Sequence, residues 1–285
     1  FSSLGIFSEP LFTAIGDAAM QLVHKCNPQD AAQILTAFAK FKIKNEDLFQ
    51  ALCTQASKAD WEEQGGESVT SFLWALGTLR QSSDMRTLLR SLLRRVSVLA
   101  PTLRVRHVVL ALTGLAKIAP LVETSRVSKD FRRAISDIVS RIESIVSDLD
   151  PQDVGLVAWA ISALSVEDRA SLLLLLFKHS STMMEKLSWW SIAHLEYAFR
   201  KADDCQPRMH WDESPHNLDS TTFFSLLDAR TELEEKRLGE ESESFHSIPE
   251  EAFIKEAPWV NFGVDNGRVL LVGKANALKR KLRDA

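Results

Sequence analysis

Cysteine is scarce in this 285-residue sequence, and Cys26, Cys53 and Cys205 are too widely spaced to form a Cys-x-x-Cys motif. A disulfide framework is therefore not expected, and we interpret all three as small buried or half-buried thiols in a reducing compartment. Long apolar runs are also lacking. The stretch "SLLLLLF", residues 171–177, is far shorter than the roughly 20 apolar residues that a membrane span needs. We expect no membrane span and interpret this stretch as part of a buried helix.

The sequence also lacks the common catalytic motifs. It contains no Gly-x-Gly-x-x-Gly, no Gly-Lys-Ser phosphate loop, no Gly-x-Ser-x-Gly and no His-Glu-x-x-His. Potential metal ligands gather between Cys205 and His216, but their spacing matches no closed zinc site. We therefore expect a protein that is not an enzyme and that carries no metal and no cofactor.

What the sequence does contain is an internal repeat. The stretch "NPQDAAQILTAFAKF", residues 27–41, returns as "DPQDVGLVAWAISAL", residues 150–164. When Asp30 and Asp153 are aligned, three further segments follow the same pattern from Ser68, Arg104 and Ser191. The residues 4, 7, 8 and 11 positions further on are apolar, which predicts one buried face of an α-helix. The seventh is alanine in every segment, and this favours a close approach of a neighbouring helix: Ala37, Ala75, Ala111, Ala160 and Ala198.

A second pattern follows each of these helices. "EDLFQAL", residues 46–52, resembles "EPLFTAI", residues 9–15, and looser versions begin at Asp84, Asp130 and Asp168. Acidic residues and proline are typical of helix starts. The reference residues are 38, 36, 49 and 38 positions apart, and we attribute the long interval to extra residues in "APLVETSRVS", residues 119–128. The sequence therefore predicts an all-α fold, an α-solenoid of about five helical hairpins.

The end of the chain differs in composition, and we divide the sequence into a helical-repeat domain, residues 1–237, and a C-terminal region, residues 238–285. A last helix is expected over residues 218–237, followed by a polar, acidic linker. The turn sequence Asp265-Asn266-Gly267 lies between two short β-prone runs and predicts a small hairpin, with a basic tail after it. We expect this extended arm to gain its order from a partner or from the solenoid.

The net charge of −4 hides a strong segregation of charge. Residues 80–141 contain thirteen arginines and lysines against four acidic residues, whereas residues 203–256 contain fifteen acidic residues against five basic ones. Arginine grips phosphate through two hydrogen bonds and releases counterions, so the basic segment favours an RNA backbone as ligand. A solvated or internally paired basic face remains the alternative. The candidate RNA-binding residues are Arg90, Arg94, Arg95, Arg104, Arg106, Arg132 and Arg133.

Aromatic residues recur at the sixth position of the repeat, where Trp74, Trp159 and Tyr197 share their place with Thr36 and Leu110. Aromatic rings at such positions can stack on RNA bases. Packing between repeats is the interpretation that we favour, because a threonine and a leucine occupy the same position.

These motifs, over roughly residues 8–237, resemble the octotricopeptide repeat and the related heptatricopeptide and FAST-kinase-like segments. The resemblance implies a mitochondrial or plastid RNA-binding solenoid that acts in transcript stability, processing, translation or ribosome assembly. The sequence departs from these families because it shows no RAP-type domain and has only about five helical pairs. A short array reads few bases, which favours a part fixed within a larger ribonucleoprotein.

The first hypothesis is thus a non-enzymatic RNA-binding protein, a structural component of a mitochondrial ribosome in the matrix that contacts rRNA and neighbouring proteins. A plastid is the alternative location. The second hypothesis is a protein–protein scaffold or assembly subunit of another organellar complex, held through the C-terminal arm.

Overall fold

The computed structural model describes residues 8–79, 85–122, 128–164, 169–188, 190–195 and 197–198, and the secondary structure in these ranges is helical. The α-helices are α1 (Glu9–Leu22), α2 (Pro28–Lys40), α3 (Glu46–Ala56), α4 (Gly66–Leu79), α5 (Arg86–Leu99), α6 (Val105–Val122), α7 (Ser128–Ile145), α8 (Pro151–Ala163) and α9 (Arg169–Thr182). Short 3-10 helices follow four of them: η2 (Val23–Lys25), η3 (Ala100–Thr102), η4 (Val146–Asp148) and η5 (Met184–Lys186). The predicted all-α fold is confirmed.

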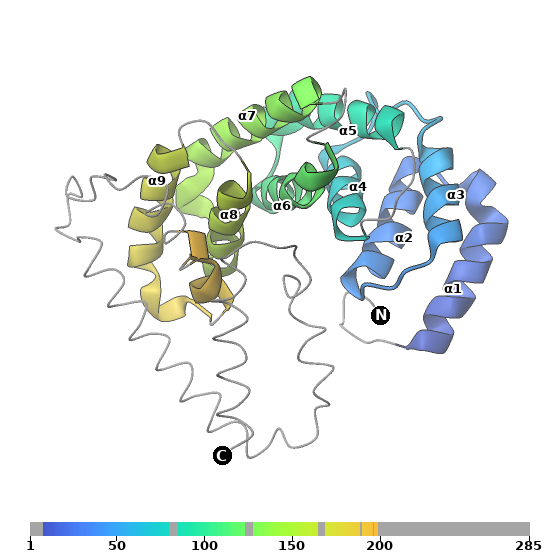
Figure 1. Ribbon diagram of the computed structural model, residues 1–285, viewed down its shortest axis with the longest axis horizontal. Coiled ribbons are helices and arrows are strands. Elements are labelled where there is room, and N and C mark those ends of the chain that lie inside the picture. Colours follow the sequence, from blue (N-terminus) through green and yellow to red (C-terminus); the bar gives the residue numbers. More distant parts are fainter. Residues whose placement is uncertain are drawn as a thin grey trace, which may run out of the picture. The chain divides into compact units, whose positions relative to one another are not determined.

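The helices form two compact units. The first contains the described residues up to Asp148 together with Ala163 and Leu164, and the second contains residues 149–162 and the described residues from 169 onward. In the first unit, α2, α4 and α6 pack side by side in one layer, while α1 packs on α3 and α5 on α7 in a second layer (Figure 1). In the second unit, a carbon added at Gly155 of α8 would lie 2.8 Å from the Cα atom of Ser191, so α8 closely approaches the helical residues 190–195. This alternation is the helical-hairpin repeat that the sequence predicts.

The repeated Asn/Asp-Pro-Gln-Asp sequences begin helices because their side chains satisfy free backbone N–H groups. Asn27 accepts a hydrogen bond from the backbone N–H of Asp30 (2.9 Å), and Asp30 accepts one from the backbone N–H of Asn27 (3.1 Å), which forms a capping box at α2. At α8, Asp150 accepts from the N–H of Asp153 at 2.8 Å. Asn45 caps α3 in the same way through Leu48.

The predicted buried face is present in three of the aligned helices. In α4, α6 and α8 the residues at positions 4, 7, 8 and 11 of the repeat are all buried. In α2, Phe38 is buried, but Ile34, Ala37 and Phe41 are only half-buried. The difference has a physical reason: α2 is the first helix of its layer in the described chain, so it packs against one neighbour of its own kind, α4.

A close approach of α4 and α6 occurs at two glycines, which the repeat alignment does not single out. A carbon added at Gly77 would lie 2.8 Å from the carbonyl oxygen of Gly114, and one added at Gly114 would lie 2.9 Å from the backbone nitrogen of Trp74. Neither distance leaves room for a side chain. The two backbones are therefore in direct contact at this crossing.

In each of the four hairpins that the structure describes, one side chain closes the hairpin in the same way, through what we call the closing bond; Arg141 does so with two of its nitrogens. A side chain near the end of the second helix donates to a backbone carbonyl just before the first helix of the same hairpin. The four bonds are Gln55 Nε2 to His24 O (3.3 Å), Arg95 Nε to Gln64 O (2.9 Å), Arg141 Nη2 to Leu103 O (3.1 Å) and His179 Nε2 to Leu149 O (2.9 Å). Leu103 and Leu149 are buried, and buried backbone carbonyls need such partners. All four bonds connect the second helix to the start of the first helix of the same hairpin.

The residues to which we attribute the long interval between the third and fourth repeats do not all lie between the two helices. Helices α6 and α7 have 18 residues each, against 13 or 14 in α2, α4 and α8. The first residues of "APLVETSRVS", 119–122, belong to α6 itself, and Pro120 lies inside this helix. The interval is long partly because the helices are long. The predicted last helix, domain boundary at 237, acidic linker, hairpin and basic tail all lie outside the described residues.

Candidate nucleic-acid interface

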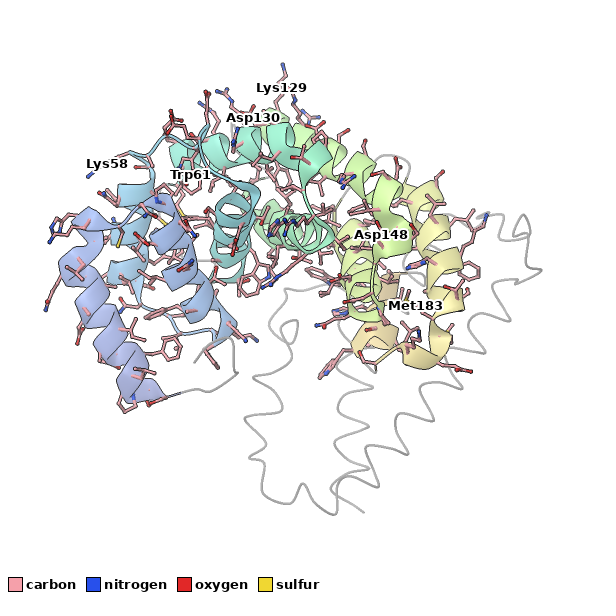
Figure 2. The ribbon with its side chains drawn as sticks, turned by 180° about the vertical axis from the view of Figure 1, so that it is seen from behind. Lys58, Trp61, Lys129, Asp130, Asp148 and Met183 are labelled. Carbon is pink, nitrogen blue, oxygen red and sulfur yellow. The ribbon has the colours of Figure 1, made fainter. Side chains whose placement is uncertain are left out.

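Four of the predicted RNA-binding arginines lie together on α5 and α7, which pack side by side in the second layer. Arg90 and Arg94 are one helical turn apart on α5 and both reach Asp130 at the start of α7, with nitrogen–oxygen distances of 3.6 and 3.4 Å. Arg133 pairs with Asp137 of its own helix at 3.8 Å. Figure 2 labels Asp130 and the neighbouring Lys129, both in the first turn of α7. We call the set Arg90, Arg94, Lys129, Asp130, Arg132 and Arg133 the α5–α7 ridge.

Positive charge dominates the α5–α7 ridge, because its five cations outnumber Asp130 and the neighbouring Asp137, which pairs with Arg133. Arg132 is exposed, and no ion pair to it is found in the described part of the chain. Ion pairs at exposed positions contribute only about 0–1 kcal/mol, because water screens them and two long side chains must be ordered. The side chains of Arg90 and Arg94 are 43% and 66% exposed, so a phosphate group can reach them from solvent, whereas the Asp130 side chain is 22% exposed.

Two further predicted arginines, Arg104 and Arg106, lie on other elements, at the turn from η3 into α6. Both side chains are exposed, whereas the neighbouring His107 is half-buried. Burial lowers the pKa of His107, and Arg106 and Arg104 lower it further, while Glu67 raises it. We call Arg104, Arg106 and His107 the α6 start.

Arg95 differs from the other candidates because it makes a closing bond. Its Nε donates to the carbonyl of Gln64 at 2.9 Å, and the side chain is half-buried. Arg141, which the sequence analysis does not select, makes the corresponding bond to Leu103. The structure thus gives Arg95 a role within the fold, and its RNA contact stays a prediction. Sequence alone cannot separate Arg95 from Arg94, since both are adjacent arginines of one helix.

The recurring aromatic position lies at the surface of the first-helix layer and contacts neighbouring helices. Trp74 is half-buried, and the Nζ atom of Lys117 lies 4.7 Å from the centre of its ring. The same Nζ donates to the hydroxyl of Thr78 at 2.9 Å. In the second unit, the rings of Trp159 and His194 are 6.2 Å apart. These contacts favour the packing interpretation.

The described ranges also contain two of the three cysteines, several histidines and many carboxylates. No group of three metal-ligating side chains occurs there, and none of the helices described is long and apolar enough to cross a membrane. Cys53 is buried, which raises its thiol pKa to about 12, and Cys26 is half-buried. Both agree with the expected small buried or half-buried thiols. Cys205 and the potential ligands around it lie outside the described residues.

Fold and surface together define a helical-repeat protein with a strongly cationic α5–α7 ridge. The family of RNA-editing substrate-binding complex 6 proteins matches residues 1–210, which cover all the described helices, and the chain belongs to this family. No curated protein matches the chain. Membership supports the coarser part of the sequence-based expectation, an RNA-associated helical protein of an organelle. It does not specifically support membership of the octotricopeptide or heptatricopeptide families, and it does not support a role in the ribosome.

Proposed function

We propose that the chain is a non-enzymatic, RNA-binding subunit of a mitochondrial RNA-editing substrate-binding complex. The family match carries this proposal, because the family's name refers to such a complex. It also favours this complex over the mitochondrial ribosome and rRNA, which the resemblance to organellar repeat proteins suggests. A matrix location follows from the proposed complex and remains part of the proposal.

The RNA contact is assigned to the α5–α7 ridge first and to the α6 start second. Both carry exposed guanidinium groups at positions where no closing bond occupies them. Phosphate is the part of RNA that arginine binds irrespective of base sequence. A protein with few repeats and an arginine surface is therefore expected to hold the RNA backbone rather than to read many bases.

The test measures the affinity of the purified full chain for a fluorescently labelled single-stranded RNA by anisotropy, over a series of salt concentrations. Lys129→Glu with Arg132→Glu changes the ridge, and Arg104→Glu with Arg106→Glu changes the α6 start. The matched control is Lys25→Glu with Lys58→Glu, two exposed lysines of other elements with the same change of charge. The ridge variant should weaken binding about tenfold or more and flatten the dependence on salt by about one unit per lost phosphate contact, while the control should bind nearly as the parent chain does.

Equal weakening by all three variants would show that only the net charge matters, and unchanged binding by the ridge variant would refute the assignment. Circular dichroism of each variant establishes that the helices are retained. Crosslinking in a native extract, with sequencing of the attached RNA, then separates an editing substrate from rRNA.

The second candidate function is a protein–protein scaffold in the same kind of complex, and the acidic residues 203–256 favour it. Deletion of residues 238–285 should then release the chain from its complex during sedimentation. Retention in the heavy fraction would argue against this function. An intact complex together with lost RNA crosslinks in the ridge variant would favour the first function.

A further inference from the structure

Asp130 is the carboxylate on which two arginines of another helix converge. Its Oδ2 atom lies 3.6 Å from Nε of Arg90 and its Oδ1 atom lies 3.4 Å from Nε of Arg94, so each oxygen faces a different guanidinium group. The two arginines are four residues apart on α5, and like charges at this spacing repel each other. Asp130 offsets this repulsion and connects both side chains to the start of α7, where Figure 2 labels it.

Asp130 is better suited than either arginine to be the fixed point of this cluster. It lies in the first turn of α7, where the helix dipole and the free backbone N–H groups favour a negative charge. Its side chain is the least exposed of the three, and the next residue, Phe131, is buried. Arginine side chains are long and lose much rotamer freedom when they are held in one place. A short, largely covered carboxylate therefore holds two long, exposed side chains.

Each arginine keeps the outer end of its guanidinium group for a ligand. Both contacts to Asp130 use Nε, and within the described part of the chain neither Arg90 nor Arg94 donates a hydrogen bond from an Nη nitrogen. The two Nη groups form a planar fork that can bind one phosphate through two parallel hydrogen bonds. Contact through Nε therefore orients a guanidinium group without occupying this fork.

We propose that Asp130 is a positioning residue for the RNA backbone, which holds Arg90 and Arg94 side by side with their Nη groups free before RNA binds. The inference rests on the proposed function, because it concerns the same phosphate ligand. A side chain that becomes ordered only on binding loses its rotamer freedom at that moment, which weakens the complex. Asp130 removes part of this loss for two arginines at once. Its negative charge also repels phosphate, and the positioning effect is the larger of the two.

The experiment measures the affinity of the full chain for a labelled single-stranded RNA by anisotropy, in the parent chain and in Asp130→Ala. Asp137→Ala is the matched control, because Asp137 lies on the same helix, carries the same charge and pairs with only one arginine, Arg133, at 3.8 Å. If charge alone mattered, both variants would bind RNA more tightly than the parent chain. Asp130→Ala should instead bind about three- to tenfold more weakly, as expected when two arginines must be ordered on binding. Asp137→Ala should bind as tightly as the parent chain or more tightly.

A second background separates positioning from a general role in the fold. In a chain with Arg90→Ala and Arg94→Ala, Asp130 has no arginine of α5 to position. Adding Asp130→Ala to this chain should therefore not weaken RNA binding any further. A residue that only supports the start of α7 would weaken binding in both backgrounds. Circular dichroism shows whether each variant keeps its helices. Asp130→Asn, which keeps the shape of the side chain without its charge, should weaken binding in the same direction and replaces the alanine variant if that one unfolds.

The outcomes distinguish this inference from the proposed function. Tighter binding by Asp130→Ala, an equal response of Asp137→Ala, or weakening in both backgrounds would each overturn the positioning role. In these cases a loss of affinity in Arg90→Ala with Arg94→Ala would still leave the α5–α7 ridge as the RNA site. Unchanged affinity in that double variant would refute the RNA contact of Arg90 and Arg94, and the positioning role would be overturned with it.

Discussion

Substitution of Gly114 by alanine should destabilise the first unit, although alanine is the better helix former. The added carbon would lie 2.9 Å from the backbone nitrogen and 3.0 Å from the Cα atom of Trp74. Backbone atoms of a helix cannot rotate away, so α4 or α6 must move as a whole. Overpacking of this kind costs up to about 3 kcal/mol, and the gain in helix propensity returns about 1 kcal/mol. We expect a net loss of about 2 kcal/mol in the free energy of unfolding.

Urea unfolding followed by far-ultraviolet circular dichroism measures this loss. Gly65→Ala is the control, because an added carbon there meets nothing within 4 Å, and its effect should stay within about 0.5 kcal/mol. Gly77→Ala affects the same crossing, so the double variant Gly77→Ala with Gly114→Ala should lose less than the sum of the two single losses. A Gly114→Ala chain as stable as the parent would refute the direct backbone contact.

Two other predictions concern single side chains. Burial and the neighbouring Asp150 raise the pKa of Asp153 from 3.8 to about 6. Between these pH values the folded chain binds more protons than the unfolded chain does. The stability of the chain therefore falls as the pH rises through this window. Asp153→Asn should therefore stabilise the chain by about 1 kcal/mol at pH 7, a value that allows for solvent screening. Below pH 3.8 the substitution should have little effect. Thermal melts of the variant and the parent chain at pH 7 and below pH 3.8 measure both effects. Arg141→Ala removes the charged donors of a closing bond and leaves the buried Leu103 carbonyl without them, which should cost about 1.5–3 kcal/mol in urea unfolding. The exposed Arg132→Ala should cost less than about 0.5 kcal/mol, and equal losses in the two variants would contradict a structural role for Arg141.

Much of the fold could be predicted from the sequence because it follows from periodicity. The spacing of Phe72, Ala75 and Leu76 fixes a buried helix face wherever a neighbour covers both sides, and the Asn27 and Asp150 caps fix where helices begin. The contacts between particular helices do not follow from the spacing of apolar residues in the sequence. The glycine crossing joins residues 77 and 114, which occupy different positions of the repeat alignment.

The candidate site was predictable in composition but not in detail. A count of charges finds the basic segment, yet it cannot tell which guanidinium is available for a ligand. Arg94 and Arg95 are neighbours in the sequence, but one reaches Asp130 on α7 and the other reaches the Gln64 carbonyl before α4. The direction of a side chain depends on helix rotation, and successive residues point about 100° apart.

The closing bonds make each hairpin a ring of hydrogen-bonded and covalent connections rather than an open pair of helices. In such a ring neither helix can slide along the other or separate at its end without first breaking the bond at Gln55, Arg95, Arg141 or His179. We therefore expect local unfolding to open a whole hairpin at a time. Hydrogen exchange should accordingly show blocks of roughly one repeat, with both helices of a hairpin losing protection together.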